Sequence, residues 1–139
     1  MIIENINIDG KEVPFAASAA IPRIYRIQFR RDIFKDMTKI EKSVKRSQGK
    51  QAQEQKEGKV SESDIPIEDL EVFENVAFVM AKHAAQKKGL EFPEDVYEWL
   101  DQFDTFSIYV ILPEIVKLWN LNQQTQETAK KNLDQVAGK

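Results

Sequence analysis

The sequence contains no cysteine and a single histidine, His83. The lack of cysteine excludes disulfide frameworks, cysteine-based zinc sites and thiol chemistry. A lone histidine, with no cysteine or second histidine to pair with, does not indicate a nucleophilic triad. The five glycines are scattered, so they form no glycine-rich phosphate-binding loop. We therefore expect no catalytic residue, no metal site and no cofactor site, and we predict that the protein is not an enzyme.

Long apolar runs are also missing. A membrane-spanning helix needs about 20 mostly apolar residues. The densest apolar segment, residues 106–119, is shorter than that and contains Pro113, Glu114 and Lys117. The first residues lack the basic start and the long apolar run of a secretory signal. We expect neither a membrane anchor nor a secretory signal.

The chain has no overall basic excess, because its net charge is −3. This balance argues against a generic nucleic-acid binder. The charge is nevertheless uneven: residues 23–59 hold 12 Lys or Arg against 5 Asp or Glu, whereas residues 62–114 hold 3 against 13. Two interpretations stay open. The segments form two solvated faces, or they form complementary surfaces that meet within one subunit or between neighbouring subunits.

Asp9 and Gly10 form the clearest local signal near the start of the chain. This pair is favoured in a two-residue type I′ turn, because both central positions need a positive φ. Apolar residues alternate with polar ones on both sides of the pair, as Ile6 and Ile8 do before it. The pattern predicts a β-hairpin over about residues 5–16, and Pro14 indicates that its second strand is an edge.

Residues 21–47 carry two competing patterns. Tyr25, Ile27 and Phe29 alternate with polar residues, which is typical of a strand. A longer stripe has apolar residues three or four apart, which is typical of one helix face: Tyr25, Phe29, Ile33, Met37, Ile40 and Val44. Because the helical pattern is the longer one, we predict a single helix over these residues.

The rest of the chain predicts further helices and two unstructured segments. Residues 47–63 are rich in Gln, Lys, Glu, Gly and Ser, which favours a flexible linker. Helices are expected over about residues 64–88, from Pro93, and over about 104–121, where Pro113 should kink or restart the chain. Residues 122–139 lose most apolar content, so we expect a disordered tail. The predicted fold is mainly α, at the margin of α+β. It is a single domain over residues 1–121, with a short N-terminal hairpin followed by about four helices.

Five carboxylates crowd residues 94–104. Glu94, Glu98 and Asp101 share one face of the expected helix, so a general acid–base pair or a hard-cation site is conceivable there. No loop in the region has the alternating pattern of a calcium-binding hand. We interpret the cluster as a solvated acidic face opposite Trp99 and Phe103.

Three segments together carry a family resemblance: "IDGKEVPFAASAAIPRIYRIQFRRDIFKDM", "EDLEVFENVAFVMAKHA" and "VYEWLDQFDTFSIYVILPEIVKLWNLN". In this order they resemble the tail assembly chaperones of long-tailed, siphovirus-type bacteriophages and prophages of Gram-positive bacteria. The most specific part runs from Glu98 to Trp119. Val110 stands where the family more often has an acidic residue, which makes this face more apolar.

The resemblance implies a non-enzymatic assembly factor that acts in the host bacterial cytoplasm and is not part of the mature virion. Such chaperones bind the long, helical tape measure protein and keep it soluble until tail tube subunits polymerise around it. Many are made in two lengths by a ribosomal frameshift, and the longer form contacts the tail tube protein. The implied partners are therefore the tape measure protein, the tail tube protein through a longer form, and further copies of the chain.

On this hypothesis, apolar side chains beyond those that a helical core uses form the partner-binding or self-association surface. A helical client exposes apolar stripes, and a helical partner with surplus apolar surface can cover them. The candidate residues are Ile24, Ile27, Phe34, Tyr109, Val110, Ile111, Val116 and Trp119.

The alternative function uses the basic segment over residues 23–46. Arg23, Arg26, Arg30 and Arg31 interleave with apolar residues there, and such a helix could contact nucleic-acid phosphates. The alternative is a phage-encoded nucleic-acid-binding regulator. Basic side chains that lie along an amphipathic helix explain the same pattern without any ligand.

Overall fold

The computed structural model describes residues 1–54, 67–104 and 107–121. Its fold is mainly α with an N-terminal β-hairpin, which confirms the predicted fold class. The hairpin consists of β1 (Ile2–Ile8) and β2 (Lys11–Ala17). It is followed by α1 (Ala20–Phe29), α2 (Ile33–Glu54), α3 (Ile67–Lys88), α4 (Val96–Leu100) and α5 (Ser107–Val110), and the chain is helical again over 112–121.

The hairpin has the predicted turn. β1 and β2 pair in antiparallel register with Ile8 opposite Lys11, so Asp9 and Gly10 form a two-residue loop. Both have a positive φ, 55° and 79°, as a type I′ turn requires. The strands extend beyond the predicted residues 5–16 at both ends.

The hairpin turn is tied to a distant part of the chain. The Asp9 carboxylate accepts hydrogen bonds from the Ser107 hydroxyl and from the backbone N–H of Asp104, at 2.8 Å for the latter. The hydrogen bond from Ser107 and, to a smaller extent, the one from Asp104 lower the pKa of Asp9. Lys11 Nζ donates to the backbone oxygen of Gln102 at 3.4 Å. The turn therefore packs against the segment that leads into α5.

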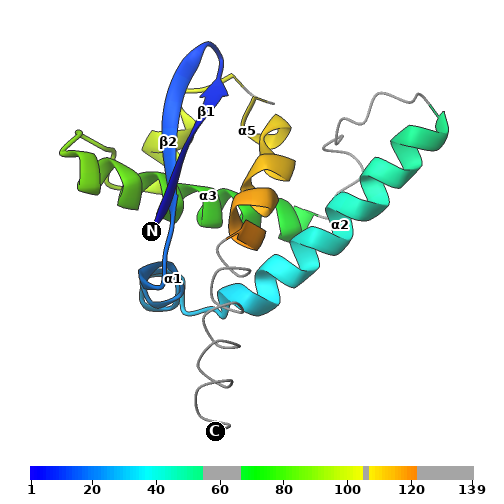
Figure 1. Cartoon of the computed structure of the whole chain (residues 1–139), viewed down its shortest axis with the longest axis horizontal. Coiled ribbons are helices and arrows are strands. Elements are labelled where there is room, and N and C mark those ends of the chain that lie inside the picture. The colour runs from blue at the N-terminus through cyan, green and yellow to red at the C-terminus, as the bar shows by residue number, and fades with distance from the viewer. Residues whose placement is uncertain (55–66, 105–106, 122–139) are drawn as a thin grey trace, which may run out of the picture.

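α3 is the central helix of the fold (Figure 1). β2, α1 and α2 all pack on it. The 112–121 helix adds Leu112, Ile115 and Leu118 to the same core. Because neighbours cover several sides, α3 buries more residues than a single helix face would include: Leu70, Phe73, Val76, Ala77, Phe78, Val79, Met80, Ala81, Ala84 and Ala85.

The predicted single helix over residues 21–47 is wrong, because the chain breaks between α1 and α2. Arg30 ends α1 in the left-handed conformation, with φ 60°, and its N–H donates to the oxygen of Arg26 at 2.8 Å. Asp32 then accepts a hydrogen bond from the N–H of Phe34 at 2.9 Å, which caps the start of α2. The predicted apolar stripe survives the break, since Tyr25, Ile33, Met37, Ile40 and Val44 are all buried.

Two other predicted boundaries differ from the structure. α2 continues to Glu54, so residues 47–54 are helical where a flexible linker was expected. Residues 55–63 of that linker and the predicted tail over 122–139 lie outside the described residues. The helix expected from Pro93 begins at Val96, where the Asp95 carboxylate accepts from the N–H of Glu98 at 2.8 Å.

The C-terminal helices restart at the predicted proline. α5 ends at Val110, the chain turns at Ile111, and Pro113 lies in the first turn of the 112–121 helix. This position suits proline, because the first amides of a helix have no partner within the helix. None of the helices in the described ranges is both long and apolar enough to cross a membrane.

Candidate partner-binding groove

An open groove of about 610 Å³ lies between α3 and α4, and it is mostly lined by apolar side chains. We call it the α3–α4 groove. Leu70 is buried, Val96 and Leu100 are partly buried, and Tyr97 is 82% exposed at the edge. The lining residues are Phe29, Ile67, Leu70, Glu71, Glu74, Asn75, Val96, Tyr97, Leu100 and Tyr109.

Helical spacing places these side chains on one surface. On α3, Leu70, Glu71 and Glu74 lie three, four and seven residues after Ile67, which is the spacing of one helix face. On α4, Val96 and Leu100 are four apart and point to the same side. The Asp95 cap fixes the start of α4 and therefore the position of its apolar side chains.

The charged side chains of the groove are acidic. Glu71 and Glu74 both come from α3, and among the described residues that line the groove there is no lysine or arginine. The Tyr109 hydroxyl donates to Glu74 Oε2, which joins α5 to α3 at one end of the groove. An apolar floor with carboxylates at its edge suits a partner whose apolar stripe is flanked by basic side chains.

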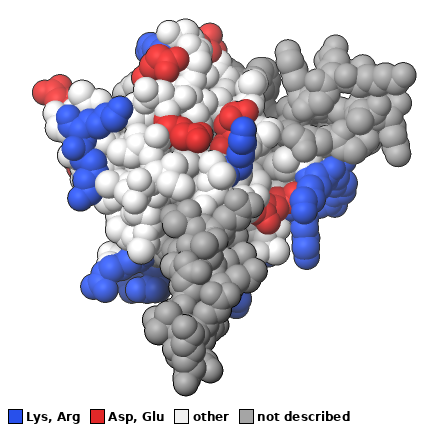
Figure 2. Space-filling model, in the orientation of Figure 1, with Lys and Arg blue, Asp and Glu red and all other residues white. Residues whose placement is uncertain are grey.

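A second candidate surface lies on α1, and we call it the basic face of α1: Arg23, Arg26, Ile27 and Arg30. All four side chains are exposed, and Ile27 is 61% exposed. Figure 2 shows lysine and arginine side chains gathered over α1 at the lower left and along α2 at the right. The basic charge expected from the sequence is therefore on the surface of these two helices.

Asp36 holds the turn between α1 and α2, residues 30–32, in place. Its carboxylate is 3% exposed and accepts hydrogen bonds from the Tyr25 hydroxyl at 2.7 Å and from Arg31 Nε and Nη2 at 2.8 and 2.9 Å. Burial raises the pKa of Asp36, but the hydrogen bonds from Arg31 and Tyr25 and the Arg31 charge outweigh burial and lower it overall. Burial and the bond to Asp36 raise the pKa of Tyr25.

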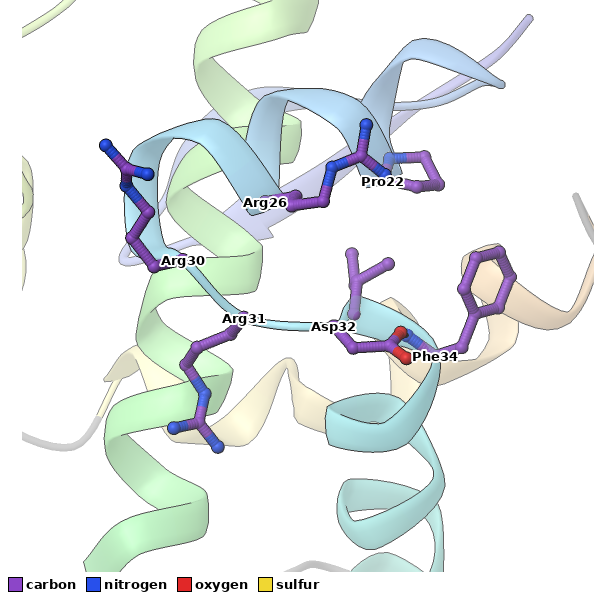
Figure 3. A pocket seen from close by; sticks show the side chains of 7 residues that line it. Pro22, Arg26, Arg30, Arg31, Asp32 and Phe34 are labelled. Carbon is purple, nitrogen blue, oxygen red and sulfur yellow. The ribbon is translucent and has the colours of Figure 1, made fainter.

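A hollow of about 440 Å³ lies beside this turn, between Pro22, the turn and Phe34. Figure 3 shows that the side chains of Arg26, Arg30 and Arg31 leave the backbone in different directions. Arg31 is also occupied by its ion pair with Asp36. The three guanidinium groups do not converge on one point, so the hollow is not built as a site for a single phosphate.

The eight predicted partner-binding residues do not form one surface. Ile27 and Val110 are exposed at 61%, and Phe34 is half exposed with its ring 5.3 Å from that of Trp119. Tyr109 lines the α3–α4 groove. The partly buried residues that pack on the core are Ile24, Tyr109 and Val116.

Ile111 and Trp119 correct the sequence-based prediction. They are 4% and 1% exposed and belong to the core, so they are not available to a partner in this structure. Ile111 was expected to lie partly off the buried face of the helix predicted over about residues 104–121. The turn at Ile111, between α5 and the 112–121 helix, directs its side chain inward instead.

The sequence did not point to most of the groove. Leu70, Val96, Tyr97 and Leu100 each look like ordinary helix residues, and the groove arises only when α3 and α4 pack together. One signal was available in the sequence. Tyr97 is an aromatic residue among acidic ones on a short helix, and the apolar side of that helix already contains Trp99, which indicates that Tyr97 lies at the surface.

Two members of the acidic cluster over residues 94–104 have partners within the chain. Asp95 caps α4, and Glu94 lies 3.9 Å from Lys82 Nζ. Within the described ranges, no group of three or more His, Asp or Glu side chains is placed to hold a metal ion. His83 is partly buried, and burial and the nearby charge of Lys87 lower its pKa.

Comparison of the chain with known protein families, curated proteins and solved structures finds no match.

Proposed function

We propose that the protein is an assembly chaperone that covers apolar stripes on a helical client. Specifically, we propose a tail assembly chaperone of a long-tailed phage, with the tape measure protein as its client. The support comes from the resemblance of three ordered segments to that family and from the α3–α4 groove. The observation that carries the proposal is the groove, because it offers an open apolar surface of a size that suits a helix face.

We expect the complex between the groove and its client to be weak and reversible. Burying one Leu- or Phe-sized side chain contributes about 1.5–3 kcal/mol. Several such anchors are needed to exceed the cost of association, so a single groove favours affinity in the micromolar range, about −8 kcal/mol. Reversibility is what a chaperone requires, since it must release the client when tube subunits polymerise.

Coexpression with the tape measure protein tests the proposal. We expect the chain to raise the soluble fraction of that protein. Tyr97→Asp places a charge at the edge of the groove and should remove most of the gain. The matched control is Leu90→Asp, which also charges an exposed apolar residue, 54% exposed, but lies outside the groove. If the unaltered chain gives no gain in solubility, the proposal is wrong.

Purified mature particles provide a second test. A chaperone leaves before the virion is complete, so we expect mass spectrometry of purified virions to detect the tail tube protein but not this chain. Detection of the chain in stoichiometric amounts would identify a permanent tail component instead.

A nucleic-acid-binding regulator is the second candidate, and the exposed arginines of the basic face of α1 favour it. Non-specific binding through phosphates is strongly salt-dependent. A gel shift on duplex and single-stranded DNA at low salt, lost in Arg23→Glu/Arg26→Glu, would support this candidate. We expect no shift, because the three guanidinium groups beside the 30–32 turn diverge and Arg31 is paired with Asp36.

A further inference from the structure

We propose that the α3–α4 groove selects helical client segments whose apolar stripe is flanked by lysine or arginine, and that Glu71 determines this selectivity. The inference rests on the proposed function, because it names the kind of client segment that the same groove binds. It gives one side chain of the groove a role in specificity, and it predicts that segments with acidic flanks bind poorly.

The floor and the edge of the groove differ in chemistry. Leu70 is buried in the floor, whereas Glu71, the next residue along the chain, is exposed at the edge. Ile67 and Tyr97 are also at the edge, at 83% and 82% exposure. Apolar surface of this kind favours any amphipathic helix, so it provides affinity without distinguishing one segment from another. The charged groups at the edge are what distinguish between segments.

Glu71 is available to pair with a client. Within the described part of the chain it forms no ion pair. Arg31 and Lys39 line a neighbouring polar hollow of about 380 Å³ together with Glu71, but Arg31 is paired with Asp36. An ion pair between Glu71 and a client therefore breaks no ion pair within the described residues.

The two elements that form this edge are acidic. The first half of α3, residues 67–77, holds four Asp or Glu and no Lys or Arg, and residues 93–104 around α4 hold five and none. Glu74 lines the groove as well, and it accepts a hydrogen bond from the Tyr109 hydroxyl. The field at the edge formed by α3 and α4 therefore attracts basic side chains and repels carboxylates.

Lysine and arginine suit this edge for a second reason. Their long apolar stems cover apolar surface while the charged end stays in solvent. A client helix that places its stripe on Leu70, Val96 and Leu100 can therefore lay a basic stem along Tyr97 or Ile67 and direct its charge towards the carboxylates. A segment with Asp or Glu on the same flank brings like charges together, which weakens binding.

Two synthetic peptides of about 20 residues, long enough to be helical, test the selectivity. They share one apolar stripe and differ only in the flanking residues, which are lysine in one peptide and glutamate in the other. By fluorescence anisotropy at low salt, we expect the unaltered chain to bind the lysine peptide at least about tenfold more tightly. Salt should reduce this ratio, because exposed charges are screened. No measurable binding of the lysine peptide, equal affinities or a preference for the glutamate peptide would each overturn the proposal.

Three variants assign the selectivity to Glu71. Glu71→Lys should weaken binding of the lysine peptide at least about tenfold and strengthen binding of the glutamate peptide. Glu91→Lys makes the same change in net charge at an exposed carboxylate outside the groove, so it should leave the ratio of affinities nearly unchanged. Tyr97→Ser removes apolar surface that both peptides use and should weaken both by the same factor. If Glu91→Lys shifts the ratio as much as Glu71→Lys does, net charge rather than Glu71 determines selectivity, and the proposal is wrong.

Circular dichroism should show that every variant is folded, and the result separates this inference from the proposed function. If the chain raises the solubility of the tape measure protein but binds both peptides equally, the selectivity is wrong and the chaperone proposal stands. If the chain prefers the lysine peptide through Glu71 but gives no gain in solubility, the selectivity stands and the proposed client is wrong.

Discussion

At the residue scale, Asp36 is the side chain that joins the two helices of the segment predicted as one. It accepts hydrogen bonds from Tyr25 on α1 and from Arg31 in the turn, while lying in the first turn of α2. Almost half of the Arg31 side chain is in solvent, at 46%, so the ion pair itself contributes little. The buried hydrogen bond from Tyr25 is therefore the larger contribution to stability.

Tyr25→Phe tests that contribution. Removing the hydroxyl leaves a buried carboxylate with one donor fewer, and hydrogen bonds to charged groups are worth about 1.5–3 kcal/mol. We expect the free energy of unfolding, measured by urea denaturation, to fall by about that amount. Tyr97→Phe is the matched control, because this hydroxyl is on an 82% exposed side chain, and its effect should stay within about 0.5 kcal/mol. Equal effects of the two substitutions would show that the Asp36 contact is not stabilising.

The pH dependence of stability gives a separate prediction for Asp36. Its pKa is lower in the folded protein than in the unfolded chain, so its contribution is present above the unfolded pKa and is lost as pH falls through the folded pKa. Asp36→Asn should therefore be less stable than the unaltered protein at pH 7. The difference should shrink as the pH falls below the ordinary aspartate pKa of about 3.9, because the unfolded chain then takes up a proton that the folded carboxylate still resists. Urea denaturation at several pH values measures the free energy of unfolding of both proteins. A difference between them that stays constant from pH 7 to pH 3 contradicts the lowered pKa of Asp36.

At the scale of elements, the break between α1 and α2 shows what periodicity misses. The stripe from Tyr25 to Val44 keeps its spacing across the break, so the pattern alone predicted a continuous helix. The break depends on one residue, Arg30, in the left-handed conformation, which is usually taken by glycine. The sequence contained a weaker signal for it, because Asp32 is a suitable cap for a new helix.

Substitutions at Arg30 test this description of the break. A left-handed conformation costs roughly 1–2 kcal/mol for a residue with a Cβ, and glycine avoids that cost. Arg30→Gly should raise the free energy of unfolding by up to about 1 kcal/mol, since glycine also gains entropy in the unfolded chain. Arg30→Val should lower it by about 1–2 kcal/mol, because β-branched residues tolerate this conformation poorly. In thermal denaturation, we expect the unfolding temperature to be highest for Arg30→Gly, lower for the unaltered protein and lowest for Arg30→Val. An Arg30→Val variant that unfolds at or above the temperature of the unaltered protein contradicts a left-handed Arg30.

At the scale of the whole molecule, local signals predicted the hairpin and the helical class, but they did not predict which elements pack against one another. Asp9–Gly10 predicted its turn because the conformation depends on two adjacent residues. The hydrogen bonds from Asp104 and Ser107 to Asp9 connect parts of the chain that are far apart in sequence, so no local pattern predicts them. The α3–α4 groove has the same origin, since neither helix alone indicates it.

Trp119 and Val110 illustrate the same limit and yield a prediction. Both were expected at a partner surface, but only Val110 is exposed, whereas Trp119 is buried beside Phe34. Trp119→Ala should lower the free energy of unfolding by about 3–5 kcal/mol, because it leaves a large cavity in the core. Val110→Ala should change it by no more than about 0.5 kcal/mol. Chemical denaturation measures both, and a small effect at Trp119 would place it at the surface.

The central claim is that the α3–α4 groove binds a helical client, and hydrogen–deuterium exchange tests it most directly. α4 has five residues and stands at the edge of the groove, so its amides should exchange quickly in the free chain. Adding a purified helical segment of the tape measure protein should slow exchange in α4 and in the first turns of α3, and Tyr97→Asp should abolish this protection. Binding with no protection of α4, or with protection confined to α2, would contradict the account.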